Sequence, residues 1–352
     1  MGRIINHFDD VLKNVKATAK QVDCTGAGVM IIHKNEVVLE EYWGKQSNHR
    51  NAPPINKNTQ FHVASVRKSY IGFAIAYAVH YGYIASIDDP VLNYFPVYTK
   101  NIYAGVTIRH LLTHTHGLRL INNQVVYEFE PGTNWAYRGA GIELLTDIVK
   151  RATGKDVATI INEHVIKPLQ LQETGWYGEM QQNFVEVIRS EDDPAWYTSG
   201  VTDGSKMNMY VSIRDLAKWG LLHLNRGKWQ GEQMVVPEIF ECLTSIQSPE
   251  KLHNKAPING YLWFVQKEES SNRDRMEIGQ KVPKYSYQML GYTGVTLLVI
   301  PKYDLVAVRA FNSFGSPLDF DYLEVVRSFG DTVMRCLHKS ENDRELGKEA
   351  LK

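Results

Sequence analysis

The sequence predicts an α+β protein in which helices flank an antiparallel sheet that carries a large, mostly helical insertion. Three observations predict this class. Strand-like runs occur near both ends of the chain, a long segment with helical periodicity separates them, and a further helical pattern follows the last strands. Strands from both ends are therefore expected to meet in one sheet, with a cleft between that sheet and the insertion.

The N-terminal part of the chain predicts a helix followed by a hairpin. Apolar residues recur at helical spacing over residues 4–20. The runs GVMIIH and EVVLEEYW then flank Lys34 and Asn35, which form a polar two-residue turn. The polar residues 45–60, with two adjacent prolines, are expected to form a loop.

Residues 61–224 are mostly helical in pattern, with loops marked by glycine and proline. The apolar run over residues 70–79 has about half of the ~20 residues that a membrane span needs, so it predicts a buried helix. The runs VTLLVIP and LVAVRAFN around a KYD turn predict a second hairpin, and a helix is expected over residues 322–337.

These elements predict one structural unit over residues 1–352 rather than two independent domains. Its sheet region is expected to comprise residues 1–60 and 255–340, approximately. Residues 61–235 would form the helical region, and the charged residues 340–352 a solvated tail.

Composition excludes several classes of protein. The 352 residues include 39 Lys+Arg and 39 Asp+Glu, which gives no electrostatic argument for a nucleic-acid or membrane partner. A hydrophobic content of 43% with 22% charged residues indicates a globular protein, not a disordered or fibrous one. The first residues lack the apolar stretch of a signal peptide, so a cytoplasmic location is expected.

No metal or other cofactor is predicted. The three cysteines, Cys24, Cys242 and Cys336, are far apart and fit neither a zinc spacing nor a disulfide framework. His110 and His114 are one helical turn apart and could bind a metal, but no third ligand is evident beside them. We therefore favour capping and packing roles for these histidines.

The most informative pattern is Ser65-x-x-Lys68, which precedes a strongly apolar helix. On a helix, residues three apart share one face, so the Lys68 amine can reach the Ser65 hydroxyl. Burial lowers the pKa of an amine, and a neutral amine can accept the proton of a nucleophilic serine. The pattern recurs at Ser248 and Lys251, but a proline follows Ser248 there, which favours a helix N-cap.

An ordered set of segments resembles the serine β-lactamase and penicillin-binding-protein superfamily, most closely its class C and esterase branch. The segments follow the order of that family over nearly the whole chain: FHVASVRKSYIGFAIAYAVHYGYI, TIRHLLTHTHGL, PGTNWAYRGAGIELLTDIVKRATG, VTDGSKMNMYVSIRDLAKWGLLHL and LGYTGVTLLVIPKYDLVAVRAFN. The resemblance implies a β-lactamase/transpeptidase-like fold and no cofactor.

The resemblance also implies roles for particular residues. Ser65 is the expected acylated nucleophile, and Lys68 and Tyr137 are expected to move its proton. The backbone N–H groups of Ser65 and Val295 are the expected oxyanion hole. The residues expected to bind substrate are Tyr292, Thr293, Gly294 and Gly139.

Two of these positions depart from the family pattern. Gly139 stands where the second motif usually has Asn, and Tyr292 stands where the third motif usually has Lys. The first change removes an amide that would bind the substrate, and the second removes a cation that would meet a substrate carboxylate. Both weaken the expectation of efficient penicillin hydrolysis.

The sequence therefore predicts a serine hydrolase that acts through an acyl-serine intermediate on a small ester or amide, with β-lactams among the candidates. Esterase, β-lactamase-like and peptidase-like activities stay open. Two alternatives remain. One is a penicillin-binding protein that is acylated without efficient turnover, and the other is a non-catalytic binding relative.

Overall fold

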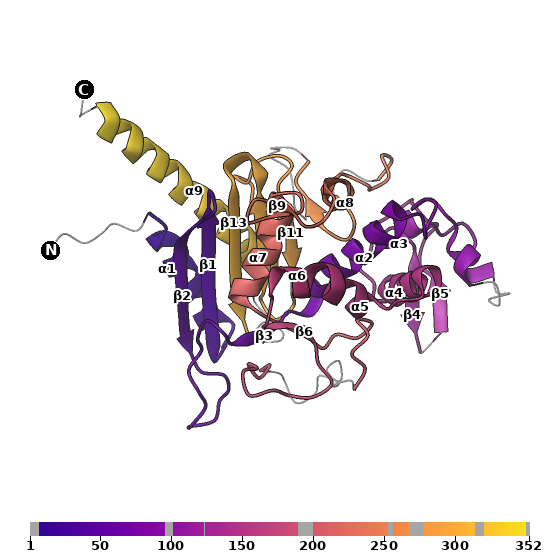
Figure 1. Ribbon diagram of the computed structural model, residues 1–352, viewed down its shortest axis with the longest axis horizontal. Helices are drawn as coiled ribbons and strands as arrows, with labels where there is room; N and C mark the ends of the chain where they lie inside the picture. The colour runs from indigo at the N-terminus through magenta and orange to yellow at the C-terminus, as the bar shows by residue number, and fades with distance from the viewer. Residues whose placement is uncertain are drawn as a thin grey trace.

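The computed structural model describes residues 7–95, 101–122, 124–188, 200–252, 256–267, 277–313 and 320–349. Its centre is a six-stranded sheet with the strand order β10-β11-β12-β13-β1-β2, and every neighbouring pair is antiparallel (Figure 1). The strands are β1 (Gly26–His33), β2 (Glu36–Gly44), β10 (Phe264–Val265), β11 (Tyr287–Leu290), β12 (Thr296–Ile300) and β13 (Leu305–Phe311).

This sheet joins the two ends of the chain, as the sequence predicts. Strand β1 pairs with β13, from Ala27 opposite Phe311 to His33 opposite Leu305. Both predicted hairpins are present, as β1–β2 and β12–β13. Lys34 and Asn35 have φ values of 52° and 63°, which is the left-handed conformation that a tight two-residue turn requires.

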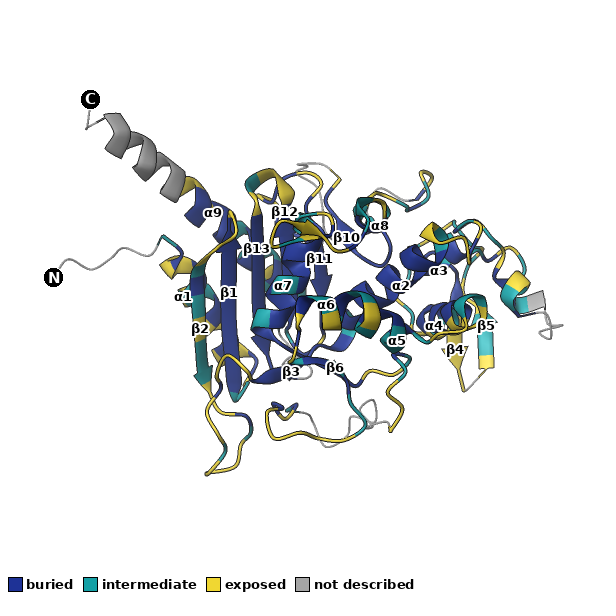
Figure 2. Ribbon diagram, viewed as in Figure 1, coloured by how far each residue is buried: buried dark blue, intermediate teal, exposed yellow. Residues whose placement is uncertain are grey.

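Helices cover both faces of the sheet (Figures 1 and 2). Helices α1 (Asp9–Gln21) and α9 (Tyr322–Glu349) pack on one face, and α7 (Ile213–Leu224) packs on the other. Successive side chains of a strand point to opposite faces, so Ile31 packs toward α1 and α9 whereas Met30 packs toward the helical region. Burial on both sides explains why β1 is a continuous apolar run.

Two predicted boundaries need correction. The last helix extends to Glu349, so the predicted end at residue 337 is wrong. The apolar periodicity of the sequence stops near residue 337. A helix can nevertheless continue beyond its apolar pattern, and α9 does so. The first helix begins at Asp9, and residues 4–6 of the predicted 4–20 segment lie outside the described residues.

Between the hairpins lies a mostly helical region, as predicted. Its helices are α2 (Lys68–His80), α3 (Ile108–Leu112), α4 (Ala140–Thr153), α5 (Val157–Ile161), α6 (Lys167–Leu169) and α8 (Pro237–Thr244). Short helical turns accompany them: η1 (Ala64–Arg67), η2 (Val91–Tyr94), η3 (Asn101–Tyr103), η4 (Asn162–Ile166) and, in the second hairpin, η5 (Pro301–Tyr303).

The helical region also contains strands that the sequence pattern does not reveal. A three-stranded sheet has the order β3-β7-β6, and two small hairpins lie outside it. The strands are β3 (Gln60–His62), β4 (Leu118–Ile121), β5 (Gln124–Tyr127), β6 (Thr174–Trp176), β7 (Met209–Ser212), β8 (Lys228–Trp229) and β9 (Glu232–Gln233). Two to four residues are too few for a period-2 alternation to stand out.

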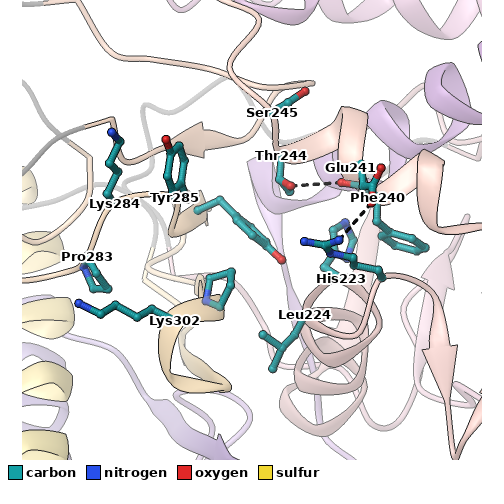
Figure 3. Close-up of a pocket in the computed structure, with 13 residues that line it drawn as sticks. His223, Leu224, Phe240, Glu241, Thr244, Ser245, Pro283, Lys284, Tyr285 and Lys302 are labelled. Carbon is teal, nitrogen blue, oxygen red and sulfur yellow. Dashed lines mark hydrogen bonds and ion pairs between the residues drawn. The ribbon is translucent and has the colours of Figure 1, made fainter.

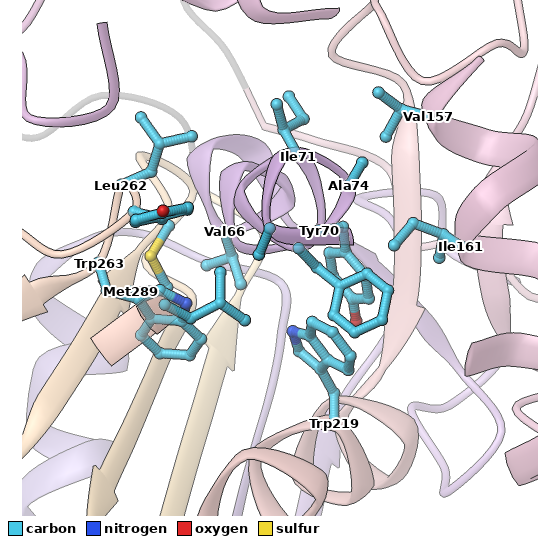
Figure 4. Packing of buried hydrophobic residues seen from close by; sticks show 14 of the residues in the cluster. Val66, Tyr70, Ile71, Ala74, Val157, Ile161, Trp219, Leu262, Trp263 and Met289 are labelled. Carbon is cyan, nitrogen blue, oxygen red and sulfur yellow. The ribbon is translucent and has the colours of Figure 1, made fainter. Parts of the chain in front are cut away.

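Helix α2 is the centre of the larger apolar cluster, and its residues from Lys68 to Ala78 are all buried. Tyr70 stacks on Trp219 of α7, with ring centroids 4.5 Å apart, and the Trp219 indole N–H donates to Ser69 Oγ at 2.9 Å (Figure 4). Helix α7 thus contacts both the sheet and the helix that follows Ser65.

Among the described residues, no helix is both long and apolar enough to cross a membrane.

Candidate active site

Three side chains predicted from the sequence meet at the N-terminus of α2. Ser65 lies in η1 and Lys68 begins α2, one helical turn later. The Lys68 amine lies 2.8 Å from Ser65 Oγ and 2.6 Å from the Tyr137 hydroxyl. Tyr137 comes from the loop before α4, so segments 69 residues apart in the chain form one hydrogen-bonded group.

The environment of Lys68 favours a neutral amine. The residue is only 6% exposed. Burial lowers the pKa of Lys68 well below its usual value, and the neighbouring charge of Arg67 lowers it further. An amine that loses its proton in this way has a lone pair with which to accept the proton of Ser65.

Tyr137 has the opposite property, because it retains its proton. Burial raises its pKa to about 12, and the hydrogen bond with Ser65 and the charge of Arg67 only partly offset that rise. Although 38% of the residue is exposed, its hydroxyl faces the buried Lys68 amine. Near neutral pH the group is therefore a phenol that can donate a hydrogen bond.

The loop that carries Tyr137 is fixed on both sides. The backbone N–H of Ala136 donates to the carbonyl of His114 at 3.0 Å, and the Trp135 indole donates to Asn259 Oδ1 at 2.9 Å. The His114 ring lies against the Tyr137 ring, with centroids 4.6 Å apart. The tyrosine is thus held toward Lys68 by contacts from distant segments.

A strained turn precedes the serine. Ala64 has a φ of 47°, a left-handed conformation that costs roughly 1–2 kcal/mol for a residue with a Cβ. The Ala64 N–H donates to Nδ1 of His62 at 3.2 Å, and Nε2 of the same ring contacts the Met207 carbonyl. These two contacts require the tautomer protonated on Nε2. His62 therefore supports the backbone conformation next to Ser65, a role that the sequence does not indicate.

The turn between β11 and β12 lies beside the same segment. Thr293 is fully buried, and its hydroxyl donates to the His62 carbonyl at 2.7 Å. A Cβ on Gly291 would lie 2.5 Å from the Val63 carbonyl oxygen, so only glycine permits this close approach. Among the described residues, the Val295 N–H has no hydrogen-bond acceptor.

The other predicted binding positions have distinct surroundings. Tyr292 is 53% exposed at the tip of the β11–β12 turn. Gly294 has a φ of 90° and lies against Phe311. Gly139 ends the Tyr137 loop, and a Cβ there would meet no atom within 4 Å. The space that an Asn would fill in the family pattern is therefore open.

The histidine cluster has structural roles. Nδ1 of His110 accepts from the N–H of Thr107 and completes a capping box at the start of α3. That helix ends at Leu112, and His114 has a φ of 57°, so the two imidazoles do not share a helical face. Within the described ranges, no group of three His, Cys, Asp or Glu side chains could hold a metal.

The second Ser-x-x-Lys pattern does not form a comparable site. Ser248 lies in a turn, and its hydroxyl accepts from the N–H of Asn259 at 2.9 Å. The prediction that Ser248 is a helix N-cap is wrong, because the described residues directly after it, 249–252, form a turn. Its hydroxyl instead stabilises the return of the chain toward β10.

Two large cavities are present in the described part of the molecule. One of about 890 Å³ is lined by Lys68, Gly139 and the first turns of α4, and it also exposes Arg67. Another of about 650 Å³ lies far from Ser65, with His223 and Phe240 on one side and Lys284 and Lys302 on the other (Figure 3). Only the first adjoins the Ser65–Lys68–Tyr137 group.

Arg67 is the residue of this site that sequence reasoning missed. Only 5% of Arg67 is exposed, although its side chain carries a guanidinium. A charged residue inside the motif, immediately before a run of apolar residues, was the available indication.

A model of the Beta-lactamase family matches residues 11–328 of this sequence. The chain belongs to that family. An uncharacterized protein of Alkalihalophilus pseudofirmus is 58% identical over 332 residues, which cover 94% of this chain and 97% of the relative. Esterase EstB of Burkholderia gladioli is 27% identical over 212 residues, about half of each chain.

The fold is that of solved members of the superfamily. A penicillin-binding protein homolog from Caulobacter crescentus superposes with a TM-score of 0.73 at 18% sequence identity, and the match covers 96% of this chain and 99% of that one. The predicted β-lactamase/transpeptidase-like fold is confirmed.

Proposed function

We propose that this protein is a serine hydrolase that cleaves small esters or amides through an acyl-enzyme on Ser65. The observation that carries the proposal is the hydrogen-bonded group in which a buried Lys68 lies 2.8 Å from Ser65 Oγ and 2.6 Å from the Tyr137 hydroxyl. An esterase among the relatives agrees with this reaction class.

In the acylation step, Lys68 accepts the Ser65 proton while Oγ attacks the substrate carbonyl carbon. The tetrahedral intermediate then collapses, and the bond to the leaving atom breaks. The Tyr137 phenol donates its proton to that leaving atom and takes up the proton carried by Lys68. Water repeats the sequence in the second half-reaction, which releases the acid and restores the Ser65 hydroxyl.

The negative charge of the intermediate needs hydrogen-bond donors. We assign this role to the backbone N–H groups of Ser65 and Val295. The Thr293–His62 hydrogen bond and the close approach of Gly291 to Val63 hold the β11–β12 turn next to the nucleophile. One donor of an oxyanion hole is typically worth about 10²–10³ in rate.

The same geometry supports a second candidate function, a penicillin-binding protein that is acylated but turns over slowly. The open space at Gly139 favours it, because a β-lactam amide would lack the side-chain partner that the family usually supplies. We assign Tyr292, in place of a lysine, to the other edge of the proposed site. Thr293 and Gly294 would complete the substrate-binding turn.

The decisive experiment is intact-mass spectrometry after incubation with a fluorophosphonate and, separately, with a penicillin. We expect a fluorophosphonate adduct on the peptide that contains Ser65, and hydrolysis of 4-nitrophenyl esters that Ser65→Ala abolishes. Ser248→Ala is the matched control, because it alters the serine of the other Ser-x-x-Lys pattern. It should retain both adduct and activity.

Each outcome separates the alternatives. A lasting penicillin adduct without ester turnover would identify the penicillin-binding protein. Absence of an adduct with either reagent would exclude a nucleophilic Ser65 and leave the non-catalytic relative.

A further inference from the structure

Arg67 is a buried cation for which the described residues provide no ion pair. Its Nε and Nη1 atoms are inaccessible to water and have no hydrogen-bond partner among the described residues. Burial lowers its pKa to about 10, so the guanidinium is charged at neutral pH. A buried charge without a partner is strongly destabilising, and such groups are normally paired.

The cavity beside Arg67 has space for an anionic group of a ligand. Arg67 lines the cavity of about 890 Å³ that also contains Lys68, and this cavity extends over Gly139. Since a Cβ on Gly139 would contact nothing within 4 Å, a ligand group can approach there without displacing protein atoms. Arg67 and Lys68, the proposed proton acceptor, therefore line one cavity.

The charges around the cavity favour an anion. Arg119 and Lys206 line it as well, and Arg138 is held there by two hydrogen bonds to Glu128 at 2.6 and 2.8 Å. The acidic side chains among the lining residues are Glu143 and Asp147. Glu143 attracts Arg67 electrostatically, but the described structure contains no ion pair between them.

We propose that Arg67 is the specificity-determining residue of this site and that it selects esters or amides bearing a carboxylate. A guanidinium suits this role because it stays charged, and its Nη2 atom, which is not one of the two inaccessible atoms, can donate a charge-assisted hydrogen bond to a carboxylate in the cavity. The inference rests on the proposed hydrolase function, and it assigns to the Ser-x-x-Lys segment a cation that is absent at Tyr292.

The test compares kcat/KM for ester pairs of similar size. Mono-4-nitrophenyl glutarate and 4-nitrophenyl hexanoate place a carboxylate or a methyl group on the acyl side, while 4-butyryloxybenzoate and phenyl butyrate do so on the leaving group. We expect a preference for the anionic ester in one of the pairs. Arg67→Gln should reduce that preference about 10- to 100-fold, the usual range for a hydrogen bond to a charged group.

Further variants keep the test informative if Arg67→Gln does not fold. Arg67→Lys retains the charge but not the planar guanidinium, so it should give an intermediate ratio. Glu143→Gln removes an acid from the cavity and should increase the anionic preference. Arg226→Gln is the matched control, since this arginine lines the distant cavity and should leave the ratio unchanged.

A binding measurement separates this inference from the proposed function. Calorimetry should detect glutarate binding to Ser65→Ala and its loss in Ser65→Ala/Arg67→Gln. Hydrolysis of neutral esters without an anionic preference, or a preference for cationic butyrylthiocholine, would overturn the role of Arg67 while leaving the hydrolase intact. Glutarate binding without hydrolysis of any ester would instead overturn the proposed function and retain the anion site.

Discussion

At the residue scale, the proposed mechanism depends on the different proton affinities of Lys68 and Tyr137. The two groups are 2.6 Å apart and both are affected by burial, but burial removes the proton from an amine and retains it on a phenol. Arg67 acts on both, because its positive charge lowers both pKa values. The same buried environment therefore favours Lys68 as the base and Tyr137 as the acid of the proposed mechanism.

This arrangement predicts the pH dependence of ester hydrolysis. The base is active only when neutral, so kcat/KM should rise with pH and level off above the pKa of Lys68. No descending limb is expected below the Tyr137 pKa of about 12. Arg67→Gln removes a nearby positive charge, which raises the Lys68 pKa and should shift the rising limb to higher pH.

The measurement is a pH–rate profile with a neutral 4-nitrophenyl ester, and Arg226→Gln serves as the control. A limb that shifts to lower pH in Arg67→Gln would contradict this account.

Gly139 permits a gain-of-function prediction. Its φ of −69° suits any residue, and a Cβ would contact nothing within 4 Å. Gly139→Asn should therefore change the free energy of unfolding by less than about 0.5 kcal/mol. By supplying an amide near the acyl group it should accelerate acylation by a penicillin roughly fivefold to tenfold, as expected for one added hydrogen bond.

Acylation can be followed by intact mass as a function of time. Gly200→Asn is the matched control, because Gly200 also has open space around it. An unchanged acylation rate in Gly139→Asn would show that position 139 does not contact the substrate.

At the element scale, the site depends on the contact between the β11–β12 turn and the segment before η1. Strand β11 ends at Leu290 and β12 begins at Thr296, so the turn projects from the sheet toward Val63. The Thr293 hydrogen bond to His62 fixes this contact from the other side. The sheet thereby positions part of the proposed site, whose expected nucleophile, Ser65, lies in η1.

Gly291→Ala should separate these elements. The added Cβ would lie 2.5 Å from the Val63 carbonyl oxygen, so the turn must move away from the nucleophile. We expect acylation by a fluorophosphonate to slow at least tenfold and the free energy of unfolding to fall by about 1–3 kcal/mol. Gly200→Ala, in open space, should change neither quantity. Wild-type acylation by Gly291→Ala would show that the turn is not needed.

At the scale of the whole molecule, α7 connects the sheet to the helical region. It packs against β1, β12 and β13 on one side, and Gly220 approaches the sheet so closely that a Cβ would lie 2.6 Å from Val306. On its other side Trp219 stacks on Tyr70 and bonds to Ser69 of α2. Helix α7 is therefore one of the elements that hold α2 in place relative to the sheet.

Trp219→Ala tests that connection. The side chain is fully buried, so its loss should reduce the free energy of unfolding by about 3–5 kcal/mol. Chemical denaturation followed by circular dichroism measures the change. Tyr285→Ala, at a residue that is 62% exposed, is the control and should shift stability by less than about 0.5 kcal/mol. A loss below 1 kcal/mol for Trp219→Ala would contradict this role of α7.

Two hairpins, the buried helix α2 and the grouping of Ser65, Lys68 and Tyr137 could be predicted from the sequence. Each depends on local spacing: a two-residue turn between apolar runs, an uninterrupted apolar stretch, or motifs that resemble a known family. The short strands of the helical region and the end of α9 could not be predicted in this way. Those strands form only by pairing with segments far away in the chain, and a helix extends beyond its apolar pattern.

The protonation of the site's side chains depends on tertiary contacts that the sequence pattern does not reveal. Lys68 loses affinity for its proton because surrounding segments exclude water from it, and no local pattern encodes that exclusion. The support of Ala64 by His62, the contact of Gly291 with Val63 and the unpaired guanidinium of Arg67 arise in the same way, between residues that meet only in the folded chain. Burial and long-range contacts set these properties, whereas the sequence alone supplied the reactive groups.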